Sequence, residues 1–193
     1  MTKRTIIACN ILEEEMKYVL DKHPEYEVDV VWIRAGLHND MNILQKRLDE
    51  IFAETPPGDE KVRLLIGFGC LPDLKSMAQE RGYPLLSTKN CLGAIVGEER
   101  LAELEKNNTM VITPQWIRKT WFAGDGMREM LGWDDTDFRI NFGRYDRILV
   151  LDMGLCPLTD EETLEAFSII EVPIETESFP MEHFEKFFLE FLN

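Results

Sequence analysis

Apolar and polar positions alternate along the chain in a way that predicts strands and helices in turn. Short apolar runs at 5–11, 26–33, 62–69 and 147–154 have the length of buried strands, and 62–69 is the most continuous of them. Amphipathic stretches with helical spacing separate these runs, as at 41–52. Repeated strand–helix units favour a parallel sheet. We therefore predict an α/β protein with a Rossmann-like, mainly parallel sheet and helices on both faces.

No long polar linker interrupts this pattern, so we predict a single domain over residues 1–193. Residues 123–146 are rich in glycine and aspartate, and we expect an irregular insertion there. Residues 155–193 predict an acidic C-terminal part with a strand and a last helix. Thr159 and Glu162 have the spacing of a capping box, which predicts a helix start.

The charge balance excludes some partners. The chain carries 36 acidic and 21 basic residues, a net charge of −15, which repels the phosphates of nucleic acids and of anionic membranes. We expect neither partner. No apolar run approaches the length of a membrane span, and the start of the chain is a poor signal peptide, so we expect a cytoplasmic protein. The acidic residues of 155–193 either aid solubility or form a docking face for a basic partner.

Each of the four cysteines follows or closes a short apolar run. Cys9, Cys70 and Cys91 fall where predicted strands end, as does His38 in the segment GLHND. In a parallel sheet these ends share one edge, where ligand sites gather. Thiolate and imidazole suit zinc or iron, and helix N-termini at this edge would lower thiol pKa values. The alternative is packing, because cysteine also behaves as a small buried hydrophobe. Cys156 is the weakest candidate.

Gly67 and Gly69 raise a second possibility. Glycines after a central strand let a nucleotide or S-adenosylmethionine approach the backbone, although this G-F-G lacks the third glycine of the usual fingerprint. An S-adenosylmethionine-dependent methyltransferase is therefore an alternative hypothesis. A non-enzymatic interaction module is another. The sequence assigns no catalytic residue.

In order along the chain, IIACNI, GLHND, LLIGFGC, a cysteine segment and ITPQWI resemble a domain family of unknown function over residues 4–155. This family is found in anaerobic bacteria and methanogenic archaea, and its members are often encoded near corrinoid-dependent methyltransferases. The pattern matches Cys9, His38, Cys70 and Cys91, together with Thr113 and Trp116. The chain departs from the family at two places. Ahead of Cys91 it reads STKN, where the family usually has an arginine, a histidine and an aspartate. Gly69 and Cys70 are directly adjacent, where the family is expected to have an intervening residue.

The resemblance implies a role in one-carbon metabolism, with a corrinoid protein or a methyltransferase as partner. Our leading hypothesis is a cytoplasmic α/β protein that binds a metal or metallocofactor through Cys9, His38, Cys70 and Cys91. Trp116 would form a wall or stacking surface. Zinc or iron is the expected metal, ahead of a corrinoid or S-adenosylmethionine.

Overall fold

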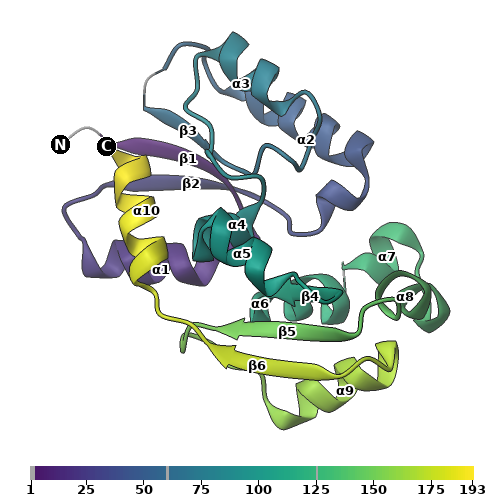
Figure 1. The fold of residues 1–193 in the computed structure, drawn as a ribbon. Coiled ribbons are helices and arrows are strands. Elements are labelled where there is room, and N and C mark those ends of the chain that lie inside the picture. Colours follow the sequence, from purple (N-terminus) through teal and green to yellow (C-terminus); the bar gives the residue numbers. More distant parts are fainter. Residues whose placement is uncertain (1–2, 60, 125) are drawn as a thin grey trace. The chain divides into compact units, whose positions relative to one another are not determined.

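A computed structural model describes residues 3–59, 61–124 and 126–193 of the chain (Figure 1). The chain divides into two compact units. The first unit comprises residues 1–97 together with 182–193, and the second comprises 98–181. The second unit is therefore continuous in sequence, and the first is completed by the end of the chain.

The first unit contains a parallel sheet in the order β2-β1-β3. The chain steps from β1 outwards to β2 and then back across β1 to β3. Right-handed crossovers in opposite directions place their helices on opposite faces of a sheet, and Figure 1 shows α2 and α3 on one side and α1 and α10 on the other. The elements are β1 (Arg4–Cys9), η1 (Asn10–Leu12), α1 (Glu13–Lys22), β2 (Val28–Ile33), η2 (Leu37–Asn39), α2 (Met41–Glu54), β3 (Val62–Leu65), α3 (Leu74–Arg81), α4 (Cys91–Val96) and α10 (Glu182–Leu192).

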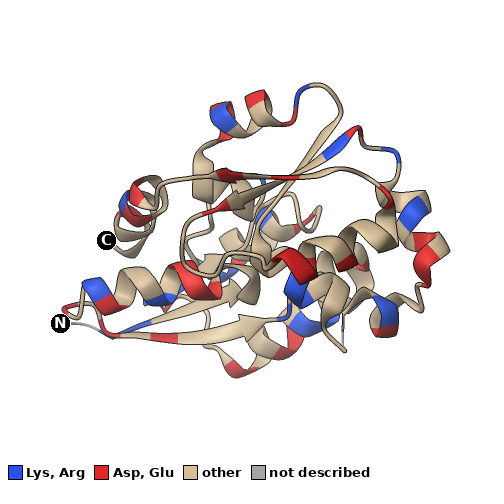
Figure 2. Cartoon of the chain, turned by 90° about the horizontal axis from the view of Figure 1, so that it is seen from below, with Lys and Arg blue, Asp and Glu red and all other residues tan. Residues whose placement is uncertain are grey.

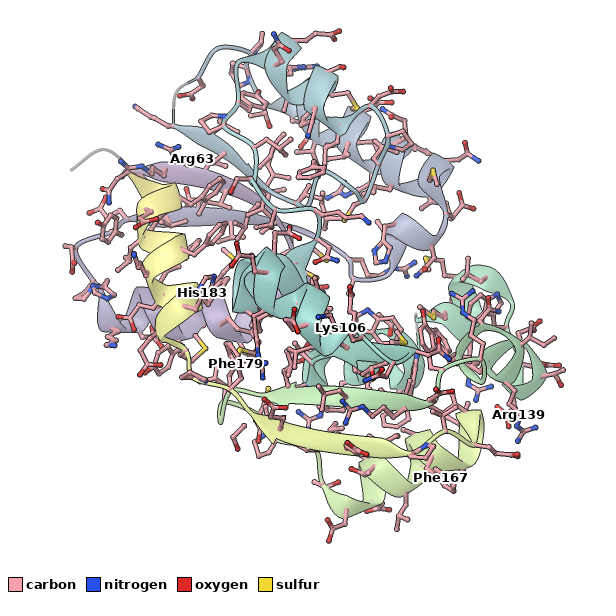
Figure 3. All side chains as sticks on the ribbon, viewed as in Figure 1. Arg63, Lys106, Arg139, Phe167, Phe179 and His183 are labelled. Atoms are coloured by element: carbon pink, nitrogen blue, oxygen red, sulfur yellow. The ribbon has the colours of Figure 1, made fainter. Side chains whose placement is uncertain are left out.

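Helix α10 closes the first unit with an aromatic face. Phe184, Phe188 and Leu192 recur at helical spacing and are fully buried, while α10 packs on α4 and α1. The Arg63 side chain of β3 reaches the same helix, with its guanidinium 5.8 Å from the ring centre of Phe191 (Figure 3). The last helix is thus part of the hydrophobic core of the first unit.

The second unit contains a parallel sheet in the order β4-β5-β6. Its largest buried side chain, Trp121, lies in an aromatic cluster with Phe138 and Phe142. Helices α8 and α9 pack on each other. The elements are α5 (Glu98–Leu104), β4 (Thr109–Ile112), α6 (Pro114–Trp116), η3 (Ile117–Phe122), α7 (Met127–Leu131), α8 (Asp135–Phe142), β5 (Arg147–Asp152), α9 (Asp160–Ile170) and β6 (Ile174–Ser178).

The predicted α/β class with parallel strands is confirmed, but the strands form two sheets instead of one. The segment 123–146 is not mostly irregular, because it contains α8 as well as α7. Asp134 caps α8, and Asp137 completes a capping box that our prediction missed. The strand expected ahead of Cys91 is reduced to one parallel bridge, between Leu64 and Leu85.

The C-terminal part also differs in detail. The capping box of Thr159 and Glu162 is confirmed at the start of α9. The strand expected over 168–175 begins later, because α9 continues to Ile170 and β6 starts only after Pro173. Pro173 interrupts this segment of the sequence and predicts an edge strand, and β6 does lie at the edge of its sheet. Acidic positions occur on helices and strands throughout the chain (Figure 2).

Candidate functional site

The candidate ligands of the first unit follow four neighbouring chain segments. Cys9 ends β1 and pairs with Ile33 at the end of β2, and the turn after β2 carries His38. Cys70 follows β3, on the other side of β1. Cys91 follows the segment at Leu85 that forms the bridge with β3. Because all these segments are parallel, their carboxyl ends share one edge of the sheet. We call Cys9, Cys70 and Cys91 the cysteine edge.

Two glycines bring the central segments of this edge together. A Cβ at Gly67 would lie 2.4 Å from the carbonyl oxygen of Lys89 and 2.4 Å from the Cα of Asn90. A Cβ at Gly69 would lie 2.9 Å from the same carbonyl oxygen. The backbone N–H groups of Phe68 and Gly69 donate to the carbonyl oxygens of Thr88 (3.2 Å) and Lys89 (2.8 Å). The glycines therefore allow close contact between two backbones, and their binding of a cofactor stays a prediction.

Cys91 is held at the start of α4 by its neighbours. The side chain of Asn90 caps the helix by accepting a hydrogen bond from the N–H of Gly93 at 2.9 Å. The Thr88 hydroxyl donates to the Asn90 carbonyl oxygen at 2.9 Å. The sequence STKN ahead of Cys91 thus supplies a turn and a helix cap.

The thiols of the cysteine edge influence one another. Burial raises the pKa of the Cys91 thiol well above its ordinary value, and the thiolates of Cys9 and Cys70 raise it further. Burial also raises the pKa of the Cys70 thiol. Backbone N–H groups at the start of α4 lower the Cys91 pKa, but the desolvation of its thiolate is larger. The expected lowering of thiol pKa values by helix N-termini is therefore wrong for Cys70 and Cys91.

The donor types at this edge suit a soft metal, but their positions do not enclose one. No group of three or more His, Cys, Asp or Glu side chains within the described residues is arranged to hold a metal ion. No disulfide joins the four cysteines, all of which are described and partly buried. The three thiols of the edge are close enough to interact electrostatically without forming a coordination shell.

His38 lies in the short helix η2, which begins after Gly36 in the left-handed conformation. The His38 residue is exposed to solvent in part. Enough protein nevertheless surrounds its ring to disfavour the charged imidazolium, which lowers the pKa of His38. The turn is attached to β1 by Asn10, whose side-chain oxygen accepts a hydrogen bond from the N–H of Ala35 at 2.6 Å. Our sequence reasoning missed Asn10. Its signal was a polar side chain directly after a buried strand.

Trp116 and Cys156 belong to the second unit. The Trp116 ring packs edge-on against Trp121 and Phe142, at centroid distances of 5.4 and 5.6 Å, so aromatic neighbours explain its position. Its role as a wall of the metal site stays a prediction. The Cys156 sulfur accepts a hydrogen bond from the Gln115 side chain at 3.0 Å. Cys156 was the weakest candidate, and it is not part of the cysteine edge.

A second polar arrangement escaped the sequence reasoning. Arg118 forms a two-pronged ion pair with Glu162 and donates to the carbonyl oxygens of Cys156 and Pro157 at 2.8 Å. Glu162 also accepts a hydrogen bond from the N–H of Thr159. Arg118 therefore fixes the loop before α9 to η3. The capping box gave Glu162 a local role, but its cationic partner lies 44 positions away in the sequence.

Fold and site together define a parallel α/β protein with a thiol-bearing sheet edge. The chain belongs to the family described as "Protein of unknown function (DUF1638)", whose model matches residues 32–188. This range includes His38, Cys70 and Cys91, but it begins after Cys9. No curated protein and no solved structure matches the chain. No helix among the described residues has both the length and the apolar character needed to cross a membrane.

Proposed function

We propose that this protein binds a thiophilic metal, or a cofactor that contains one, through the cysteine edge of its first unit. The observation that supports this proposal is the meeting of three thiols from three neighbouring parallel segments. Cys91 interacts electrostatically with both Cys9 and Cys70. Packing alone explains one partly buried cysteine at a strand end. It gives no reason for three such residues to share one edge.

The arrangement favours a ligand that brings some of its own coordination. The thiols are not placed as a closed set of three or four ligands, so a bare zinc or iron ion would require side chains to rotate towards each other. The raised pKa values of Cys70 and Cys91 mean that metal binding must also release protons. A metallocofactor needs only one or two protein ligands and fits this edge with less rearrangement.

The resemblance to proteins encoded near corrinoid methyltransferases suggests the metabolic context. On this proposal the protein is an accessory of corrinoid-linked methyl transfer, and its partner is a corrinoid protein or a methyltransferase. The cytoplasm is the compartment in which reduced thiols persist, which agrees with this role. No catalytic residue is assigned.

The metal proposal is tested by comparing cysteine variants of the two units. The parent protein, the Cys70→Ser, Cys91→Ser double variant and a Cys156→Ser control are purified without oxygen and without a metal-affinity column. Metals are then counted by mass spectrometry, and visible spectra are recorded before and after addition of cobalamin. Circular dichroism verifies that all three proteins are folded.

Two outcomes separate the proposal from packing. We expect close to one metal per chain, or a cobalamin spectrum shifted by the protein, in the parent and in Cys156→Ser but not in the double variant. A metal-free parent that leaves the cobalamin spectrum unchanged would refute the proposal and leave packing as the explanation of the cysteine edge. So would a double variant with the metal content of the parent.

A further inference from the structure

Helix α9 of the second unit carries two large apolar side chains on its exposed side. Leu164 is 68% exposed and Phe167 is 46% exposed. The face of α9 that packs on the core consists of other residues, namely Ala166, Ile169 and Ile170. Leu164 and Phe167 are three positions apart, so they are neighbours on the helix surface. Adjacent exposed apolar side chains form a candidate interaction site.

The charges along α9 are acidic, and two of them are balanced by other elements. The helix contains acidic residues and no basic one. Arg118 pairs with Glu162 in the first turn. Arg139 of α8 lies 3.1 Å from Glu171, which directly follows the helix (Figure 3). These two carboxylates therefore already have cationic partners.

Three other carboxylates beside the apolar pair have none. Asp160, Glu161 and Glu165 are exposed, and no cation within residues 3–59, 61–124 and 126–193 forms an ion pair with them. Glu161 and Glu165 are four positions apart, and like charges at this spacing destabilise a helix. A cation placed between them would relieve the repulsion. The term α9 surface is used below for these three acidic residues together with Leu164 and Phe167.

Charge decides between the possible occupants of the α9 surface. A second copy of the chain would bring a net charge of −15 to an acidic surface, and an anionic membrane would be repelled in the same way. A partner with lysine and arginine side chains complements the carboxylates. The apolar pair follows the period of a helix, which suits a partner helix with an apolar stripe of its own.

We propose that the α9 surface docks a basic amphipathic helix of another protein. The apolar stripe of that helix would cover Leu164 and Phe167, and its lysine or arginine side chains would pair with Glu161 and Glu165. The α9 surface belongs to the second unit and shares no residue with the cysteine edge. The inference is therefore independent of the proposed metal binding.

A synthetic peptide serves as the probe. It is an amphipathic helix of leucine and lysine, labelled with fluorescein, and its binding to the whole chain is measured by fluorescence anisotropy at low and at physiological salt. Two comparison peptides have the same length. One contains the same residues in scrambled order, and the other has glutamate in place of lysine.

Two double variants separate the apolar pair from the charges. The variant Leu164→Gln, Phe167→Gln removes the apolar side chains and keeps the carboxylates. The variant Glu161→Gln, Glu165→Gln removes two carboxylates and keeps the apolar pair. Circular dichroism verifies that both variants are folded. If Phe167→Gln impairs folding, Leu164→Gln alone replaces the first variant, because most of the Leu164 side chain is already in contact with water.

The matched controls lie in the first unit. Met41→Gln removes an apolar side chain that is 55% exposed. The double variant Glu54→Gln, Glu80→Gln removes two exposed carboxylates and so changes the net charge as much as the variant in α9 does. These controls separate docking on the α9 surface from a general attraction between a basic peptide and an acidic protein.

We expect the parent to bind the leucine–lysine helix and both double variants in α9 to bind it at least about fivefold more weakly, because apolar burial or ion pairs are lost. The controls should change the affinity by less than about twofold, since distant sites act independently. The two comparison peptides should bind the parent at least about tenfold more weakly. Salt should weaken binding by the parent more than binding by Glu161→Gln, Glu165→Gln.

Three results would overturn the proposal. The first is equal binding by the parent and the variant without the apolar pair. The second is a loss in the controls as large as the loss in the α9 variants, or equal binding of the scrambled peptide. The third is a dimer of the parent in sedimentation experiments that Leu164→Gln dissociates, because this would assign the α9 surface to a second copy of the chain.

Discussion

The ion pair between Arg118 and Glu162 should be the most valuable charge interaction of the second unit. Nε and Nη2 of Arg118 each lie 2.6 Å from one oxygen of the Glu162 carboxylate. About a quarter of each side chain is exposed, so water screens the pair only in part. The substitution Glu162→Gln keeps the size of the side chain and removes its charge. The amide oxygen of the glutamine can still accept one hydrogen bond from Arg118, but the attraction between two opposite charges is lost.

The size of the effect follows from the Glu162 pKa. The hydrogen bonds from Arg118, together with those at the start of α9, lower this pKa from its ordinary value of 4.5 to about 2. A tenfold change in proton affinity equals about 1.4 kcal/mol, so the ionised side chain stabilises the folded state by about 3 kcal/mol before solvent screening is considered. Screening at a partly exposed site reduces this to about 1–2 kcal/mol.

Urea unfolding at pH 7, followed by tryptophan fluorescence, measures the loss. Three of the four tryptophans lie in the second unit, so the signal reports mainly on its unfolding. We expect Glu162→Gln to lower the free energy of unfolding by about 1–2 kcal/mol. The control is Glu103→Gln, whose pair with Lys106 is about 60% exposed on both sides and should matter by less than about 0.5 kcal/mol.

The stabilisation by Glu162 should change with pH in a defined direction. Because folding lowers the Glu162 pKa, the ionised carboxylate stabilises the protein fully above pH 4.5, and this contribution disappears as the pH falls towards 2. The difference between the parent and Glu162→Gln should therefore be largest near neutral pH and shrink in acid. Equal stabilities at pH 7, or a difference that grows on acidification, would refute the reasoning.

Three further changes test other parts of the fold. Gly67→Ala should destabilise the first unit by about 1–3 kcal/mol in urea unfolding, because its Cβ meets the backbone at Asn90; the exposed Gly124, which has open space around it, should tolerate alanine. The pKa of His23 is raised mainly by Glu185, so His23→Gln should lower the melting temperature at pH 6. The difference in melting temperature between the parent and the variant should fade as the pH rises through the raised pKa. A difference that stays constant up to pH 9 would contradict this. Trp121→Ala should cost about 3–5 kcal/mol of stability, visible as a lower urea midpoint, and a cost below 1 kcal/mol would show that the aromatic cluster collapses around the gap.

Local signals were sufficient to predict many of the elements and their starts. From the sequence, either Asn39 or Asp40 is a plausible cap of α2, and the structure shows Asp40 in this role. Thr113 caps α6 ahead of Pro114, as this pair of residues predicts. These features depend on residues within one helical turn. Helix α8 was missed because aspartate takes the place of the usual glutamate or glutamine in its capping box, at Asp137. The surrounding aspartates and glycines were read as a loop.

Pairing between strands could not be predicted in the same way. An apolar run does not specify its neighbours, so nothing in the sequence indicated that β4 would pair with β5 in a separate sheet. The gathering of Cys9, Cys70 and Cys91 was predicted from the common edge of parallel strands, because that argument needs only the direction of each strand. The direction of the pKa shifts of Cys70 and Cys91 was predicted wrongly, since desolvation depends on tertiary packing.

The division of the chain has a consequence for the order in which the protein folds during synthesis. Most of the first unit is formed by residues 1–97, but its buried helix α10 follows the whole second unit in the sequence and therefore leaves the ribosome after it. Until then the surface that receives Phe184, Phe188 and Leu192 is exposed to water. The second unit, in contrast, is complete before α10 emerges. The nascent chain therefore carries an unfinished hydrophobic core for as long as residues 98–181 take to translate, and premature termination just before α10 would yield a folded second unit attached to an aggregation-prone first one.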